Sequence, residues 1–513
     1  MSSPSKADVR PRGYGVSASA LLGFCVFATV FTSGGLILSA STVSARLLSS
    51  GLLQPDDCNE MFNLAYQLLG WLSVVWLGLE PSIGPRWCAA IGLLVAVGGN
   101  VMLAVALAVR CTSGALYGLG LGLVGGGGNG LYLMCFHVAP PLFAERRQGL
   151  VVGVLNGAFQ ASTLVYLLLN EHAIGMGSFF AAYATLTLAV SLATLAAFPD
   201  TAYAQGASAS LTAPRCACCT RGGNGACQLC ASVWRELCRA LSLAAPSLRL
   251  GLFWSYALAF SWTQATHAWL QGVGASQLYW PSASAAFYEW GQPLTYSALS
   301  IVCSPLAGAL IDGVGIRTEV CVLLGLSMGG ILCAWLAGRC LADGHECLAW
   351  PTVVLTALVP AFLFPLEFAY LLKTFPPRAF TGLLLTVIMT SNLVGFVNWP
   401  FLDLAKPFGQ EPSQGNALFF LIPTALSAVW PLWWLTLRPG PKHALDDEGE
   451  PPTREPPTRE PPTREPPTRE LPKGAIAVHI AQSQGPDATE GSWTRRTESH
   501  ATSARVSECV SVL

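Results

Sequence analysis

Charged side chains are scarce in this sequence. Only 11% of its 513 residues are Asp, Glu, Lys or Arg, whereas 52% are hydrophobic, and an ordinary soluble domain has about 25% charged residues. Too few polar side chains are present to cover a folded chain of this length, which excludes a typical water-soluble enzyme. The 28 basic and 29 acidic residues leave a net charge of −1, so no basic surface for a nucleic acid is expected.

Motifs for cofactors and covalent chemistry are also missing. The glycine-rich run from Gly118 to Gly128 is not followed by Lys-Ser or Lys-Thr, which excludes a Walker phosphate loop. Glycines at this density inside an apolar segment instead let helix backbones approach closely. No His cluster, Ser/His/Asp set or carboxylate pair falls at one depth of the predicted spans. We therefore expect no enzymatic activity, no cofactor and no metal site.

Long apolar runs dominate what is present. A membrane-crossing helix needs about 20 mostly apolar residues, because about 30 Å of hydrocarbon must be spanned at 1.5 Å per residue. The first run follows basic residues as a signal peptide would, but its length favours an uncleaved span. The sequence contains twelve such runs: 16–39, 61–79, 87–109, 113–138, 150–169, 177–198, 250–270, 287–311, 320–336, 349–372, 380–401 and 417–437.

The spacing of these runs predicts two groups of six helices. The predicted parts are an N-terminal tail at 1–15, a first bundle at 16–198, a linker at 199–249, a second bundle at 250–437 and a tail at 438–513. Lys and Arg are concentrated on the side of the two termini, which predicts cytoplasmic termini and a cytoplasmic linker. The linker cysteines have spacings that zinc sites use, but the segment lacks His, which favours a reduced or acylated loop.

The C-terminal tail contains a short repeat. Pro-Pro-Thr-Arg-Glu occurs four times between Pro451 and Glu470. Proline pairs at this spacing impose extended geometry, and alternating Arg and Glu keep the segment solvated, so we expect no fold there. The repeat is interpreted as a spacer, with display of a motif for a cytoplasmic partner as the alternative.

A loop motif follows the eighth run. Gly308, Asp312, Gly315 and Arg317 fit the pattern G-x-L-x-D-x-x-G-x-R, which resembles the inter-helix loop of the major facilitator superfamily. The resemblance implies an all-α membrane protein with twelve transmembrane helices in two six-helix halves. In that superfamily the loop recurs after the second helix.

The equivalent loop after the second run is degraded. Gly84 and Arg86 are in place, but Pro81 occupies the position of the acid and Glu80 lies one position early. This departure puts the charge contact of the first half in doubt. A plain alternative for each loop is a helix-ending glycine turn beside an arginine on the cytoplasmic side.

A narrower resemblance covers the fourth and fifth runs. The Gly-Gly-Gly-Gly-Asn segment at 125–129 and the Asn-Gly-Ala-Phe-Gln segment at 156–160 resemble the L-type amino acid transporter 3-like family. The family implies sodium-independent facilitated transport of large neutral amino acids, and relatives move nucleobases. Gln160 replaces an acid of the family pattern, and Gln264 opens a Gln-Ala-Thr run where the family has a Gln-Leu-Arg-like one. Both changes predict a shifted substrate preference.

Ionisable residues inside the runs are few and mark functional sites or buried pairs. Glu367 lies among apolar neighbours and must be protonated, paired or in contact with water, so it is a candidate for proton coupling; a structural hydrogen bond is the alternative. His267 is the second candidate. His137 and Glu289 lie near the predicted membrane surfaces, where local pairing is the simpler interpretation.

Neutral polar side chains are the candidate substrate ligands, because they recognise a zwitterion or a base without placing charge in the membrane. Asn156 and Gln160 are four residues apart and share a helix face. The alternative for each is an interhelical hydrogen bond. The candidates are Thr32 and Ser33, beside Gly34 and Gly35 where a helix can loosen, together with Asn156, Gln160, Gln264 and Asn392.

These observations predict a multi-pass membrane transporter of small organic solutes. Facilitated transport of neutral amino acids by alternating access is the first interpretation, and nucleobase transport or proton-coupled symport is the second. A non-transporting membrane sensor or scaffold is the alternative from another class. The expected partners are a small-molecule solute and the lipid bilayer, and the family resemblance makes the plasma membrane the expected location.

Overall fold

The protein is described from a computed structural model that is helical throughout its described residues. These residues are 17–33, 36–170, 175–199, 225–272, 292–342, 349–376 and 379–396, with 429, 432, 433, 435 and 436. Most of the predicted twelfth span and the whole repeat tail lie outside them.

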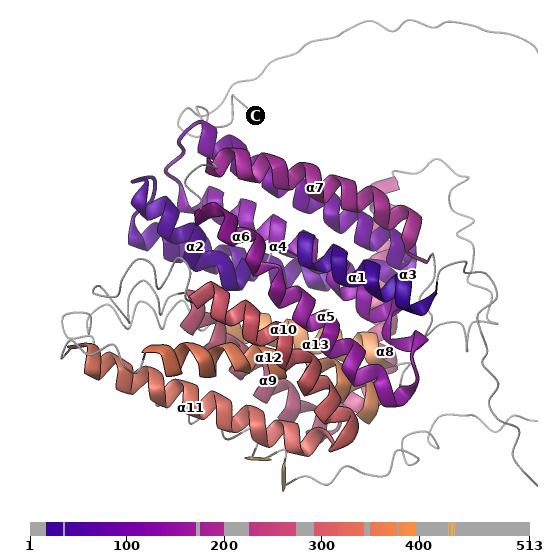
Figure 1. The fold of residues 1–513 in the computed structure, drawn as a ribbon. Helices are drawn as coiled ribbons and strands as arrows, with labels where there is room; N and C mark the ends of the chain where they lie inside the picture. Colours follow the sequence, from indigo (N-terminus) through magenta and orange to yellow (C-terminus); the bar gives the residue numbers. More distant parts are fainter. Residues whose placement is uncertain are drawn as a thin grey trace, which may run out of the picture. The chain divides into compact units, whose positions relative to one another are not determined.

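Thirteen α-helices are present in the described part of the chain (Figure 1). Seven are long and apolar enough to cross a membrane, judged by length and composition, and two shorter ones are also apolar. The helices are α1 Ala18–Thr32, α2 Leu36–Ser49, α3 Pro55–Ala108, α4 Gly114–Val138, α5 Gln148–Ala161, α6 Thr163–Leu167, α7 Met176–Ala197, α8 Gly225–Leu248, α9 Gly251–Gly272, α10 Gln292–Gly313, α11 Ile316–Ala342, α12 Ala349–Thr374 and α13 Phe380–Gly395.

The predicted spans agree with these helices over most of the sequence. The fourth, sixth, seventh, eighth, ninth and tenth runs each correspond to one helix, α4, α7, α9, α10, α11 and α12, and the eleventh corresponds to α13. The fifth run is divided between α5 and α6 at Ser162, whose hydroxyl donates to the Phe159 carbonyl at 2.6 Å.

The prediction of one continuous first span is wrong. Helix α1 ends at Thr32, with Ser33 as its C-cap, and α2 begins at Leu36. The Thr32 hydroxyl donates to the Ala28 carbonyl at 2.6 Å and so satisfies an acceptor in the last turn. Gly128 of α4 lies against the Thr32 carbonyl and the Ser33 backbone. The break occurs next to Gly34 and Gly35, where the sequence allows a helix to loosen.

The second and third predicted spans are the two helical parts of α3, which meet at a kink between them. Gly84 interrupts its helical geometry with φ 81° and ψ 163°, and it lies between Pro81 and Pro85. Proline has no amide hydrogen to donate, and a positive φ is accessible to glycine without strain. The glycine of the degraded loop therefore provides the bend between the two spans.

Helix α4 packs against both parts of α3 through its glycines. Gly118, Gly122 and Gly126 face the part before the bend, where they meet Met61, Leu68 and Leu72, whereas Gly120 and Gly127 face the part after it. Two hydrogen bonds reinforce this packing: Trp76 Nε1 donates to the Gly126 carbonyl at 2.7 Å, and Asn129 Nδ2 donates to Ser73 Oγ at 2.6 Å.

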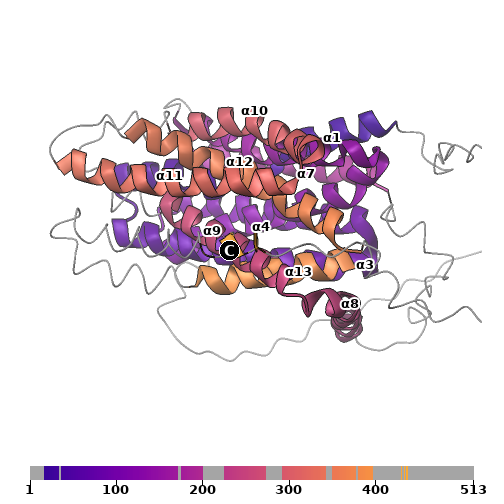
Figure 2. The same cartoon turned by 90° about the horizontal axis from the view of Figure 1, so that it is seen from below.

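The predicted linker contains a helix that the sequence analysis did not identify. Helix α8 ends at Leu248, and α9 begins at Gly251 (Figure 2). Leu237, Leu241 and Leu248 are separated by four and seven residues and pack against the hydrophobic core, which is the pattern of an amphipathic helix.

Replacing Gly127 with alanine should destabilise the protein by about 1–3 kcal/mol, because the added methyl would meet the Gly92 carbonyl and the Ala96 amide. Gly98→Ala is the matched control on α3, since no atom lies within 4 Å of its added methyl. Thermal unfolding in detergent measures both variants. Equal melting temperatures for the two would contradict backbone contact at Gly127.

Candidate functional site

Helices α5 and α10 are in backbone contact over three turns, and this contact joins the two predicted halves. Gly149 and Gly308 lie against each other, Gly153 lies against the Ser304 carbonyl, and Gly157 lies against Ser300 and Ile301. A side chain at Gly153 or Gly308 would meet backbone, and one at Gly149 would meet the Gly308 carbonyl and the Asp312 carboxylate. We call this contact the α5–α10 seam.

Asn156 is the hydrogen-bonding centre of the α5–α10 seam. Its Nδ2 donates to Ser304 Oγ at 2.9 Å and to the Pro360 carbonyl at 3.3 Å, and its Oδ1 accepts from the Tyr132 hydroxyl at 3.2 Å. It is fully buried and bonds to α4, α10 and α12. In this conformation the Asn156 amide makes interhelical hydrogen bonds between the halves. This is the alternative to substrate binding that the sequence analysis gave for this residue.

The loop motif after α10 closes the predicted cytoplasmic end of this seam. The Asp312 carboxylate accepts from the Gly149 amide at 3.2 Å and the Leu150 amide at 2.9 Å, so it caps the start of α5, where unpaired amides favour an anion. Lys373 Nζ of α12 donates to Asp312 at 2.6 Å. Gly315 makes the turn, with φ 108°.

Two partners of this motif were missed by the sequence analysis. From the sequence, Lys373 is only one of the basic residues on the predicted cytoplasmic side. Glu319, in the first turn of α11, is fully buried, and its carboxylate oxygens accept no hydrogen bond within the described residues. It lies within electrostatic reach of Lys373 and Asp312. The motif ends at Arg317, two residues before Glu319, so the motif does not include this acid.

The degraded loop in α3 has no acid at the position that corresponds to Asp312. Arg86 Nε donates to the Phe198 carbonyl at 2.6 Å, which ties the loop to the end of α7 in its own half. Glu80 is buried, with 3% of its surface exposed. At the start of α13, which corresponds to α5 in the second half, no side chain caps the helix.

A second seam joins α3 to α13. Gly70 lies directly against the Asn392 side chain, and Gly395 lies against Tyr66 and the Gln67 amide. Asn392 Nδ2, Gln67 Oε1 and Asn63 Nδ2 are buried without a hydrogen-bond partner in the described part of the chain. We call this contact the α3–α13 seam.

One unpartnered amide in each seam lies at a similar depth. Gln160 lies 12 residues after Gln148, the first residue of α5, and Asn392 lies 12 residues after Phe380, the first of α13. Each is thus about 18 Å from its helix start, near the middle of the hydrocarbon. We use the name unpartnered set for six of the buried residues with an unpartnered side-chain atom: Gln160 and Ser300 on α5 and α10, Asn63, Gln67 and Asn392 on α3 and α13, and Ser33, which lies against Gly128 of α4.

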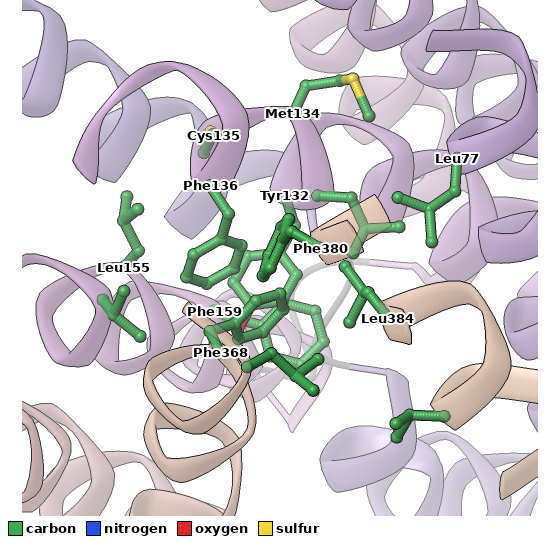
Figure 3. Close-up of a cluster of buried hydrophobic side chains, with 14 of the residues drawn as sticks. Leu77, Tyr132, Met134, Cys135, Phe136, Leu155, Phe159, Phe368, Phe380 and Leu384 are labelled. Atoms are coloured by element: carbon green, nitrogen blue, oxygen red, sulfur yellow. The ribbon is translucent and has the colours of Figure 1, made fainter. Parts of the chain in front are cut away.

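An aromatic cluster lies on the predicted cytoplasmic side of Gln160. The Phe136 and Phe368 rings, from α4 and α12, stack with centroids 3.8 Å apart and planes at 10°, and Tyr132 and Phe159 lie 4.4 Å apart (Figure 3). Glu367 is next to this stack in sequence and is 4% exposed. It lies within electrostatic reach of Tyr132 and Tyr256. The cluster closes the space between α4 and α12.

The structure brings some predicted candidates together and separates others. Ser33, Gln160 and Asn392 belong to the unpartnered set, whereas Asn156 and the Thr32 hydroxyl are hydrogen-bonded. Gln264 is half-buried on α9. His267, also on α9, lies with its ring centroid 6.1 Å from that of Tyr296, whose hydroxyl donates to Thr356 at 2.8 Å.

Asn63, Gln67 and Ser300 were not singled out from the sequence. Asn63 and Gln67 are four residues apart in an apolar segment. This spacing places both amides on one helix face and could have marked them as candidates. Among the described residues, no group of three or more His, Cys, Asp and Glu side chains is placed to hold a metal ion. Cys58 and Cys111 are free thiols.

The fold is similar to that of solved transporters. The computed structure matches the proton:xylose symporter XylE of the major facilitator superfamily, solved with bound 6-bromo-6-deoxy-D-glucose, with a TM-score of 0.59 and 15% sequence identity. The match covers 82% of this chain and 97% of that chain. No family model matches the sequence, and no curated protein matches it. The predicted major facilitator fold is confirmed, and the chain is an integral multi-pass membrane protein.

Neutralising Asp312 as Asp312→Asn should loosen the predicted cytoplasmic end, because the ion pair with Lys373 and the charge opposite the α5 amides are lost. Electron–electron distances between spin labels on the exposed residues Ser82 and Thr318 report this end. We expect a larger long-distance population than in the parent.

The control for this measurement is Glu236→Gln, which removes a surface acid paired with Arg239 at 3.6 Å. Exposed pairs of this kind contribute little, so its distance distribution should match that of the parent. An Asp312→Asn distribution identical to that of the control would contradict the capping role of Asp312.

Proposed function

We propose that the protein transports a small neutral polar solute across a membrane by alternating exposure of a site between its two halves. The observation that carries the proposal is the set of buried, unpartnered polar atoms in and beside the two seams, of which Gln160 and Asn392 lie near mid-membrane depth. Burying a polar group without a partner costs free energy. A solute with both donors and acceptors would satisfy these atoms while it is bound.

The chemistry of the set favours an uncharged or zwitterionic solute. Its members are amides and hydroxyls, and the charged contacts described above gather instead at the predicted cytoplasmic end, around Asp312 and Lys373. A solute with a net charge would find no side chain of opposite charge among these six. The solved symporter with a bound sugar derivative is an example of this fold holding a neutral polar solute.

Neutral amino acids are the proposed substrate class, and nucleobases are the second. The support for both is the resemblance of the 125–129 and 156–160 segments to the L-type amino acid transporter 3-like family. The aromatic cluster adjoining Gln160 supplies an apolar surface suited to a large side chain or a planar base. Cytoplasmic termini and a plasma-membrane location belong to the same proposal.

Uptake of radiolabelled leucine, phenylalanine, arginine and adenine into cells that express the protein tests this assignment. Saturable uptake of leucine or phenylalanine, independent of sodium, would support an amino acid carrier, and uptake of adenine alone would move the assignment to nucleobases. If none of the four enters while surface expression is confirmed, the substrate proposal is wrong and a non-transporting sensor or scaffold is favoured.

Gln160→Leu should lower uptake about tenfold at equal surface expression, because it removes hydrogen bonds worth about 1–1.5 kcal/mol each from the bound solute. Asn100→Leu is the matched control, since Asn100 is also a buried amide with an unpartnered oxygen but lies within α3 and bonds to Ala96. Equal loss in both variants would show a general folding effect rather than a role for Gln160.

Proton-coupled symport is the second candidate, favoured by the burial of Glu367 beside the aromatic cluster between the halves. If Glu367 carries the proton, uptake should rise in acid medium, and Glu367→Gln should remove this pH response because its amide cannot be protonated in that range. Glu236→Gln, a surface acid on α8, should keep the response. Uptake that is equal at both pH values in the parent protein would exclude this mechanism.

A further inference from the structure

The two halves are joined unequally at the predicted cytoplasmic end. The α5–α10 seam ends in the Asp312 carboxylate, which caps α5. If the halves are repeats, the loop in α3 should cap α13 in the same way. Instead it has Pro81 in place of the acid, and α13 has no side-chain cap.

Helix α8 occupies this end of the α3–α13 seam. Gly382, in the first turn of α13, lies against the Ala240 carbonyl and the Ala244 methyl of α8. On the other side, the Leu237 side chain lies over Gly78 of α3, with its Cγ and Cδ2 atoms 3.0 Å from where a Cβ would be. The helix therefore contacts both halves at once, through apolar groups.

We propose that α8 is an apolar latch that replaces the missing charge contact, and that Leu237 over Gly78 is the contact that breaks when this end opens. The inference rests on the proposed alternating exposure, since opening this end requires α3 to move away from α13. Helix α8 cannot then keep both contacts. Only Arg249 and Leu250 separate it from α9, and its backbone touches Gly382, so it moves with the second half.

The latch differs in kind from the Asp312 contact. The contacts of α8 with Gly78 and Gly382 come from leucine and alanine residues, and Ala244 is fully buried, as is Ser247 three residues later. Apolar contacts are insensitive to screening by salt, whereas an ion pair is weakened by it. The two seams therefore respond to different conditions, although both must open to expose the site to the same side.

The first test uses spin labels at Ser82→Cys and Thr318→Cys in full-length protein in liposomes, with the 17 native cysteines replaced by serine or alanine. Leu237→Ala should increase the long-distance population at least about twofold, because truncation leaves a gap over Gly78. Leu243→Ala is the matched control, since Leu243 is on the same helix and 42% exposed. An unchanged distribution in Leu237→Ala, or an equal change in both variants, overturns the latch.

The second test locks the contact. In the same background, oxidation before labelling should cross-link the Gly78→Cys/Leu237→Cys pair, abolish the long-distance population and stop uptake, whereas protein without this pair should keep both after the same oxidation. A cross-linked protein that still reaches long distances overturns the proposal, because α8 would then remain with α3. The distances are measured without any solute and therefore test the latch. Absence of uptake in the parent protein would contradict the proposed function but not the latch.

Discussion

The close approach of helix backbones through glycine is the constraint on which the rest of this structure depends. Helix α4 reaches both parts of α3 through glycine positions, and α5 reaches α10 through Gly149, Gly153 and Gly308. In a bilayer, apolar side chains gain little by leaving lipid for protein, so packing and hydrogen bonds must hold helices together. Contacts this close bring Asn156 within reach of Ser304 and the Pro360 carbonyl, and they place the start of α5 against Asp312.

The same constraint explains why polar atoms remain unpartnered at mid-depth. Where Gly70 accommodates Asn392 and Gly395 accommodates Gln67, the backbones come close but the amides do not pair with each other. Stability alone would select against such atoms, since an apolar residue of the same shape costs less to bury. Their presence at both seams is therefore better explained by a solute that binds there than by packing.

The sequence was sufficient to predict the class of fold, because apolar run length and the Asp312 loop are local signals. It also placed a loop at Gly84 between the second and third spans, but it could not predict which glycines of α4 meet each part of α3, since this depends on packing. In the sequence, Asn156 and Gln160 are equivalent candidates because they share a helix face. The structure distinguishes them, since Asn156 forms hydrogen bonds with Ser304 and Tyr132, whereas the Gln160 side-chain oxygen has no partner. Lys373 and Asp312 are 61 residues apart in the chain, and no motif connects them.

The central claim is that a neutral polar solute binds between the halves and is carried across. Counterflow with the purified protein in liposomes tests this claim most directly. A carrier whose binding site carries unlabelled solute out and labelled solute in exchanges the two across the membrane, whereas a sensor or scaffold does not. Liposomes loaded with unlabelled leucine, phenylalanine or adenine are diluted into the labelled compound. The account predicts transient accumulation of label for at least one of them, lost in Gln160→Leu and kept in Asn100→Leu. If the folded protein accumulates no label with any of the three, the account is contradicted.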